Sequence, residues 1–163
     1  MKTYAPFRTT DSIDSILSEI SFLGGVTEPQ REAILPLFEV GSFRKGEVIC
    51  RRGEEPSHIY VIRSGIVDLL ITDNEIEVKK REFTVGNCFG EAAMLAMINN
   101  TATFVAGEDT ELIMLSRRAF NRLRGDDPGL FAVLMINLAR ELARKLQYSD
   151  ALLLQHEHHE RHL

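Results

Sequence analysis

The sequence predicts a mainly β domain with flanking helices. Its central region, residues 40–115, consists of short runs rich in Val, Ile, Phe and Thr. Glycines separate these runs, at Gly46, Gly53, Gly65 and Gly86. Because glycine adopts positive φ without steric cost, this punctuation favours hairpins that fold into a sandwich or barrel. On both sides of the region, apolar residues recur at the three- and four-residue spacing of helices.

Two helices are expected before the barrel, over residues 13–38, behind a flexible lead-in of residues 1–12. The first has apolar residues at helical spacing and ends at a pair of glycines. In the second, Thr27 can cap the helix and Pro29 suits its first turn. This pair of helices is expected to end near Phe38.

Six strands are predicted within the barrel region, because short apolar or alternating runs lie between turn residues. They cover residues 47–51, 58–63, 66–72, 75–82, 102–106 and 111–115. The sequence “TDNE” at 72–75 predicts a hairpin turn between two of them.

Two further helices are expected after the barrel. Ser116 can cap a short hinge helix over residues 116–124, which “RGDDPG” breaks. A long helix then follows over residues 128–155, without an internal Gly or Pro after its first turn. Its first turns, “LFAVLMI”, are apolar all round, which predicts burial on several sides.

The later turns of this helix carry a seam of small and apolar residues at alternating three- and four-residue spacing. The seam residues are Ala139, Leu142, Leu146, Ser149, Leu153 and His156. Charged residues fill the opposite side, which is typical of a short coiled coil. The pattern therefore predicts a parallel homodimer through this helix, and the alternative is a helix packed on its own barrel.

Composition excludes several classes of function. A chain of 163 residues is long enough for one domain with its own core, and its formal net charge of −5 argues against binding nucleic acid or anionic membranes. The short basic runs at 79–81 and 117–118 are interpreted as solvated faces. Cys50 and Cys88 lack metal-site spacing and are expected to be buried thiols. With no signal peptide, membrane span or catalytic motif recognisable, we expect a soluble cytoplasmic protein that is not an enzyme.

One stretch indicates a ligand pocket. Residues 87–106 read “NCFGEAAMLAMINNTATFVA”, in which a Gly-Glu pair opens a short helix-prone run before an extended segment. A glycine followed by a helix start is suited to an anion, because the helix offers free N–H groups and a positive dipole end. Yet these residues include no Lys or Arg.

The order of these motifs resembles the cyclic-nucleotide-binding domain family, the sensor module of catabolite activator proteins and cyclic-nucleotide-dependent kinases. The resemblance covers about residues 15–150. It rests on “FRKGEVICRRGEEPSHIYVIRSGIVDLLI”, on “GNCFGEAAML” and on “LIMLSRRAFNRL”. It implies an eight-stranded jelly-roll (double-stranded β-helix) barrel followed by a hinge helix and a long C-terminal helix, in a stand-alone domain of a bacterial type.

The resemblance also implies a phosphate-binding cassette and its ligand, a cyclic nucleotide such as cAMP or cGMP, with no obligatory cofactor. The implied ligand-binding residues are Phe89, Gly90, Glu91, Ala92, Ala93, Asn100, Thr101 and Ala102, with Ser149 as a candidate for contacting the base. In the family an arginine pairs with the cyclic phosphate, and here that position is Asn100. Losing one charged hydrogen bond costs about 1.5–3 kcal/mol, so ordinary cyclic-AMP affinity is expected to be weak.

Three interpretations of this altered cassette remain open. The pocket binds a cyclic nucleotide weakly, with Thr101 favouring guanine as the resemblance implies. Alternatively, it takes a different or uncharged ligand, or it stays empty and the domain is a dimeric interaction module. No DNA-reading domain is recognisable after the long helix, so we expect regulation through a protein partner.

The tail at 156–163 is rich in histidine. His158 and His162 are four residues apart, and His156 and His159 three apart, which are workable spacings for a transition metal. They are weak metal-site candidates, because a frayed, solvated helix end explains the same pattern.

Overall fold

The fold was analysed in a computed structural model, which describes residues 4–7, 20–73 and 76–160. Its strands are β1 (Ala5–Pro6), β2 (Phe38–Phe43), β3 (Val48–Cys50), β4 (His58–Ser64), β5 (Val67–Asp73), β6 (Ile76–Phe83), β7 (Cys88–Phe89), β8 (Thr103–Ala106) and β9 (Thr110–Ser116). Its helices are α2 (Glu28–Ile34), α3 (Glu91–Ala96), α4 (Arg117–Asp126) and α5 (Pro128–Glu160), with 3₁₀ turns η1 (Ser21–Leu23) and η2 (Leu35–Leu37). None of the described helices is both long and apolar enough to cross a membrane.

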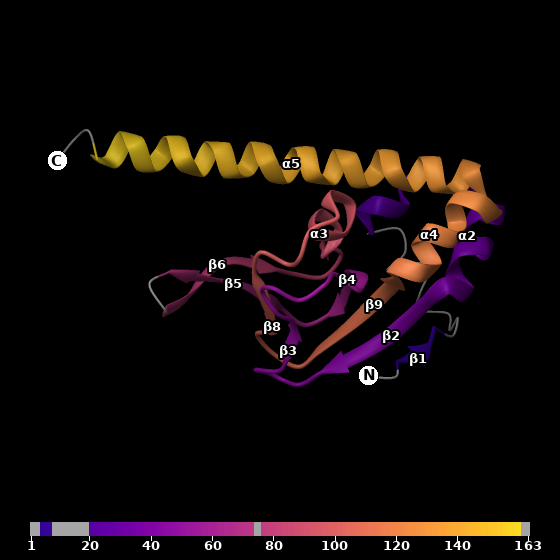
Figure 1. Cartoon of the computed structure of the whole chain (residues 1–163), viewed down its shortest axis with the longest axis horizontal. Coiled ribbons are helices and arrows are strands. Elements are labelled where there is room, and N and C mark those ends of the chain that lie inside the picture. Colours follow the sequence, from indigo (N-terminus) through magenta and orange to yellow (C-terminus); the bar gives the residue numbers. More distant parts are fainter. Residues whose placement is uncertain (1–3, 8–19, 74–75, 161–163) are drawn as a thin grey trace.

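The strands form two antiparallel sheets, as the jelly-roll prediction requires. One sheet has the order β1-β2-β9-β4-β7 and the other the order β3-β8-β5-β6. Figure 1 shows β5 and β6 projecting from the barrel as a long hairpin, while α5 runs along one side of the whole molecule. The predicted fold class is therefore confirmed.

Three strands, β1, β2 and β7, lie outside the six predicted ones. Strand β2 contains Gly41, and glycine in the sequence pattern indicates only a turn. In the structure this glycine serves packing, because a Cβ there would lie 3.0 Å from the sulfur of Met114 on β9. Strand β7 has only two residues, too few for an alternating pattern to be recognised.

Helices α2 and α4 begin at the expected caps, and α5 begins at a cap that was not predicted, Asp127. Thr27 accepts a hydrogen bond from the backbone N–H of Gln30, whose side chain in turn accepts one from the Thr27 backbone N–H, a capping box. Ser116 accepts from the backbone N–H of Ala119 at the start of α4. Asp127 accepts from the backbone N–H of Leu130 at 2.9 Å, which fixes the first turn of α5.

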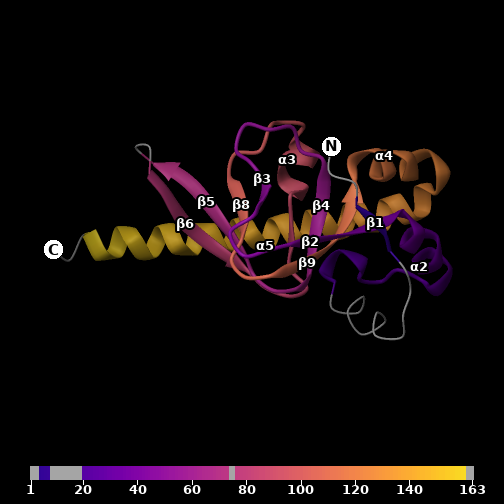
Figure 2. The same cartoon turned by 90° about the horizontal axis from the view of Figure 1, so that it is seen from below.

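The first turns of helix α5 are buried on more than one side. Leu130, Leu134 and Leu138 are fully buried against the barrel and the other helices. Phe131, Val133 and Met135 are partly buried against the same core, whereas Ile136 in the same apolar run is exposed. The expectation of burial on several sides is therefore confirmed for most of the run, and only part of its surface faces solvent. Figure 2 shows α2 and α4 gathered at the same end of the barrel as the first turns of α5.

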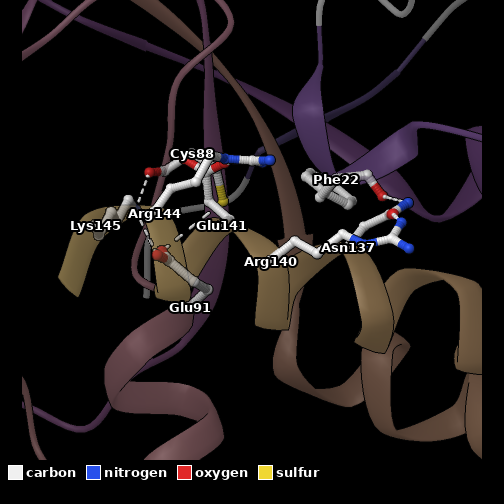
Figure 3. A network of polar contacts seen from close by, with 8 residues as sticks. All are labelled: Phe22, Cys88, Glu91, Asn137, Arg140, Glu141, Arg144 and Lys145. Carbon is white, nitrogen blue, oxygen red and sulfur yellow. Dashed lines mark hydrogen bonds and ion pairs between the residues drawn. The ribbon is translucent and has the colours of Figure 1, made fainter. Parts of the chain in front are cut away.

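A buried amide anchors α5 to the N-terminal segment. The Nδ2 of Asn137 donates to the carbonyl oxygen of Phe22 at 3.0 Å, and Arg140 donates to the Oδ1 of Asn137 (Figure 3). The same Nδ2 also donates to the carbonyl oxygen of Gly24 at 2.6 Å. Buried polar groups that find such partners position elements as well as stabilise them. The anchor holds α5 in place for the contacts its later turns make.

Candidate functional site: a cavity beneath helix α5

A cavity of about 540 Å³ lies between the cassette, strands β5, β6 and β8, and helix α5. All eight predicted cassette residues line it: Phe89, Gly90, Glu91, Ala92, Ala93, Asn100, Thr101 and Ala102. Ser149, the residue predicted to contact a base, lines it from α5. The structure thus brings together the whole candidate site, and it adds residues that the sequence did not indicate.

Gly90 sets the direction in which the cassette helix leaves the barrel. Its φ is +84°, and a Cβ would lie 2.7 Å from the carbonyl oxygen of His58 and 2.9 Å from the ring of Tyr60. Only glycine fits both the positive φ and this close approach. The ring of Phe89 stacks on that of Tyr60 with centroids 4.9 Å apart, so the chain is fixed immediately before α3.

Asn100 stands where the resemblance implies a cation. Its backbone N–H donates to the carbonyl oxygen of Glu54 at 2.9 Å, and its carbonyl oxygen accepts from Gly53 at 2.7 Å. The residue is only 6% exposed, and within the described part of the chain its carboxamide makes no hydrogen bond. Position 100 is therefore rigidly placed beside the cavity, but it brings no charge to it.

Three cations line the cavity from other elements: Lys80 and Arg81 on β6, and Lys145 on α5. Glu91 is the one carboxylate among the described lining residues, so the lining carries a net formal charge of +2. The interpretation of residues 79–81 as a solvated face is correct for Lys79, which pairs with Asp68 and Glu82 on the surface. It is also correct for Lys80, which is exposed although it borders the cavity, whereas Arg81 is partly buried.

A β-bulge explains how two adjacent residues reach the same cavity. Leu69 pairs with Arg81 and Leu70 with Lys79, so Lys80 is the extra residue of β6. In a regular strand neighbouring side chains point to opposite faces, whereas a bulge breaks this alternation. Period-two reasoning on the sequence could not have found this arrangement.

Lys145 supplies the countercharge for Glu91. Its Nζ donates to Glu91 Oε1 and, at 2.6 Å, to the carbonyl oxygen of Cys88 (Figure 3). Glu91 is 1% exposed and the Lys145 side chain 17%. Burial raises the pKa of the Cys88 thiol well above its usual range, and the Glu91 carboxylate adds to this rise. Cys88 is therefore a neutral, fully buried thiol, and the ion pair beside it has no net charge.

Arg81 is held by aromatic rings. Its guanidinium carbon lies 4.9 Å from the ring centroid of Phe83 and 5.0 Å from that of Tyr148 on α5. Such contacts stabilise a cation and orient the guanidinium plane. No carboxylate within the described residues pairs with Arg81, so the edge of its guanidinium is available to a ligand. Neither Arg81 nor Tyr148 was identified from the sequence.

The predicted dimer seam lies mostly in solvent. Ala139, Leu146, Ser149 and Leu153 are exposed and Leu142 is partly buried. Ser149 uses its hydroxyl to donate to the carbonyl oxygen of Lys145 at 3.0 Å. The side chains of His156, His158 and His159, and all of His162, lie outside the described residues. The proposed metal site therefore stays a prediction.

The model of the cyclic nucleotide-binding domain family matches residues 40–127, more than half of the chain. The chain belongs to this family. The matched region contains the whole cassette.

Among curated proteins, the chain is similar to the cGMP-dependent protein kinase of Eimeria tenella, with 31% identity over 110 residues, 68% of this chain and 11% of the kinase. It is also similar to the cAMP-dependent protein kinase regulatory subunit of Colletotrichum orbiculare, with 29% identity over 117 residues, 72% of this chain and 29% of that protein. The chain thus spans less than a third of these relatives.

Solved structures with the same fold include the Thermus thermophilus catabolite activator protein (TM-score 0.71, 29% identity, 82% of this chain and 61% of that chain). Another is the regulatory subunit of a cAMP-independent protein kinase A from Trypanosoma cruzi bound to guanosine (TM-score 0.71, 25% identity, 89% of this chain and 50% of that chain). One similar solved structure is therefore described as bound to a nucleoside, guanosine, whereas the curated relatives are named for their dependence on cyclic GMP or cyclic AMP.

Proposed function

We propose that this domain is a regulatory sensor whose cavity binds a guanine ribonucleoside, and that it binds cyclic GMP only weakly and cyclic AMP more weakly still. The observation that carries the proposal is Arg81, a guanidinium held between two rings in an otherwise largely apolar cavity, with no carboxylate partner among the described residues. No cation stands at position 100, where the cyclic phosphate of a nucleotide would lie.

The purine end of the ligand is assigned to Arg81 and the residues around it. Guanine presents two acceptors, O6 and N7, to which an arginine fork binds, whereas adenine presents a donor beside its N7. Tyr148 and Phe83 offer aromatic faces close to this guanidinium. Thr101 adds a hydroxyl on the cassette side. Similarity to cGMP-dependent kinases and to a domain bound to guanosine supports the choice of guanine.

The ribose and phosphate end rests on the cassette. Glu91 can accept a hydrogen bond from a ribose hydroxyl, and the N–H groups at the start of α3 can face a polar group. Without a guanidinium at position 100, a cyclic phosphate loses about 1.5–3 kcal/mol of binding, roughly ten- to several-hundred-fold in affinity. Binding therefore depends on the base and the ribose.

The signal is proposed to leave through α5 and to reach a protein partner. Lys145, Tyr148 and Ser149 of α5 line the cavity, and exposed apolar residues of the same turns form the seam. A ligand that changes how these turns lie on the barrel also changes the surface offered to a second copy or to an effector. In this way, binding of a ligand in the cavity would regulate the partner that contacts α5.

A second candidate function is a homodimeric interaction module that binds no nucleotide. The observation in its favour is that Glu91 already has a partner in Lys145 without any ligand. In this case the seam on α5 would be the functional surface, and the cavity would be a remnant of the family fold.

Calorimetric titration with guanosine, cyclic GMP, adenosine and cyclic AMP separates the two candidates. We expect guanosine to bind most tightly, and Arg81→Ala to weaken it by about ten- to a hundred-fold, the range of about 1–3 kcal/mol for a bidentate guanine contact. Lys79→Ala is the matched control, because Lys79 lies on the same strand outside the cavity. If the wild type binds none of the four ligands, and if none of them changes its melting curve, the interaction module is favoured.

A further inference from the structure

We infer that Lys145 is a specificity-determining residue, which adapts the inner end of the cavity to a ribonucleoside without phosphate by neutralising and orienting Glu91. The inference rests on the proposed function, since it names the residue that sets its ligand preference. Lys145 lies on α5, outside the cassette, and does this by an ion pair that is present without ligand.

The first argument is electrostatic. Glu91 is almost fully buried, and a buried carboxylate without a partner is strongly unfavourable. Asn100 cannot provide a charge, so the countercharge comes from Lys145. The pair leaves this end of the cavity without net charge. A neutral ligand can enter there at little electrostatic cost, whereas a phosphate gains no attraction.

The second argument concerns the donors of Lys145, which are already in use. Its ammonium group donates to Glu91 Oε1 and to the carbonyl oxygen of Cys88, and the ring of Phe83 lies 5.4 Å from its Nζ. An ammonium group has three N–H donors, so little of its hydrogen-bonding capacity remains for an anion. Lys145 therefore does not substitute for the family arginine as long as Glu91 holds it.

The third argument is the orientation of the carboxylate. Lys145 binds Oε1 of Glu91, whereas Oε2 has only the weak thiol donor of Cys88, with the sulfur 3.8 Å away. Oε2 is thus the oxygen with acceptor capacity left, and we assign the ribose hydroxyl to it. By fixing one oxygen, Lys145 presents the other in a constant direction, which lowers the entropic cost of binding.

The position of Lys145 does not depend on a ligand. Asn137 anchors α5 two helical turns earlier through two backbone carbonyls. The neighbouring Arg144 offers a matched control, because it pairs with Glu141 within the same helix and is largely exposed. Arg144→Met removes a cation from α5 next to Lys145 without altering the lining of the cavity.

The test measures the ratio of cyclic GMP affinity to guanosine affinity by calorimetry. Glu91→Gln should release the ammonium of Lys145 to bind phosphate and shift this ratio toward cyclic GMP by about tenfold or more, the effect of a charged hydrogen bond. Glutamine keeps an acceptor for the ribose. The double variant Glu91→Gln/Lys145→Met should lose the shift, and Arg144→Met should leave the ratio unchanged.

A second readout concerns the ribose. The wild type should prefer guanosine to 2′-deoxyguanosine, and Lys145→Met should lose most of this preference, because Glu91 is no longer held toward the hydroxyl. If Lys145→Met fails to fold, the double variant with Glu91→Gln avoids an unpaired buried carboxylate and carries the comparison.

The two proposals can fail separately. If the wild type binds neither guanosine nor cyclic GMP, the proposed ligand is wrong. The role of Lys145 would still be supported if Glu91→Gln gains cyclic GMP binding and the double variant loses this gain. If Glu91→Gln gives no shift, or if the shift persists without Lys145, the inference about Lys145 is overturned whatever guanosine does.

Discussion

Lys145 on α5 and Glu91 at the start of α3 form an ion pair, although 54 positions separate them in the chain. The pair joins the C-terminal helix directly to the cassette that the sequence indicates as a binding site. It also changes the chemistry of that cassette, because the negative charge of Glu91, which by itself would repel a phosphate, is balanced by a residue outside the motif.

Restoring the missing guanidinium should restore nucleotide binding. Asn100→Arg is expected to tighten cyclic GMP binding by about tenfold or more, since a charged hydrogen bond contributes about 1.5–3 kcal/mol. Guanosine, which has no phosphate, should be almost unaffected. Asn99→Arg serves as control, because this neighbour is exposed and does not line the cavity. Equal affinities of wild type and Asn100→Arg in calorimetry would mean that the cavity is remodelled beyond one residue.

The glycine before the cassette helix should not tolerate a side chain. Gly90→Ala combines a positive φ with a Cβ 2.7 Å from the carbonyl oxygen of His58, whereas Gly46→Ala has a similar φ of +85° and nothing within 4 Å. We expect both to lower the free energy of unfolding, and Gly90→Ala by about 1–3 kcal/mol more, the usual cost of overpacking. Urea unfolding measures the difference. Equal losses would show that the contact with β4 relaxes freely.

His58 should make the domain sensitive to mild acid. Burial lowers its pKa below the usual 6.5, although the carboxylate of Glu39, 3.1 Å away, acts in the opposite direction. In the unfolded chain, His58 is protonated near pH 6.5, whereas in the folded domain it is protonated only at lower pH. The free energy of unfolding should therefore fall as pH drops from about 7 through 6.

His58→Gln should reduce this loss, measured by urea unfolding at pH 7.5 and pH 5.5. Both proteins share the tail histidines, so the difference between them isolates His58. The aromatic neighbours, Tyr4 and Tyr60, stay uncharged in this range. If acid stabilises the wild type relative to His58→Gln, the attraction of Glu39 outweighs burial and the expected direction of the pH effect is wrong.

The seam on α5 should mediate a parallel homodimer. Leu146 is 62% exposed at its centre, an unusual position for a leucine at coiled-coil spacing unless a second helix covers it. Analytical ultracentrifugation at tens of micromolar should find a dimer for the wild type and a monomer for Leu146→Glu. Ile76→Glu on β6, where the isoleucine is 66% exposed, should leave the dimer intact. A wild type that sediments as a monomer would contradict the prediction.

Much of the architecture could be read from local pattern. Glycine turns, alternating strands and the caps at Thr27 and Ser116 depend on residues close together in the chain, so the sequence indicated the jelly roll, the hinge helix and the long helix. The cassette could also be located, because it is one continuous stretch. Strand β2 was not predicted, since only the close approach of Gly41 to Met114 on another strand shows why a glycine lies inside it.

By itself, the sequence determined the fold class, the place of the cassette and the absence of a cation at Asn100. Only the tertiary structure decided which charges meet in the cavity. Arg81 enters it through a bulge whose register is set by pairing with Leu69, and Lys145 enters it because α5 is anchored across the barrel. The spacing of hydrophobic residues determines which face of a helix or strand is buried. Which distant side chains come together depends on the strand register and on how the helix packs on the sheet, and no local stretch of sequence specifies these.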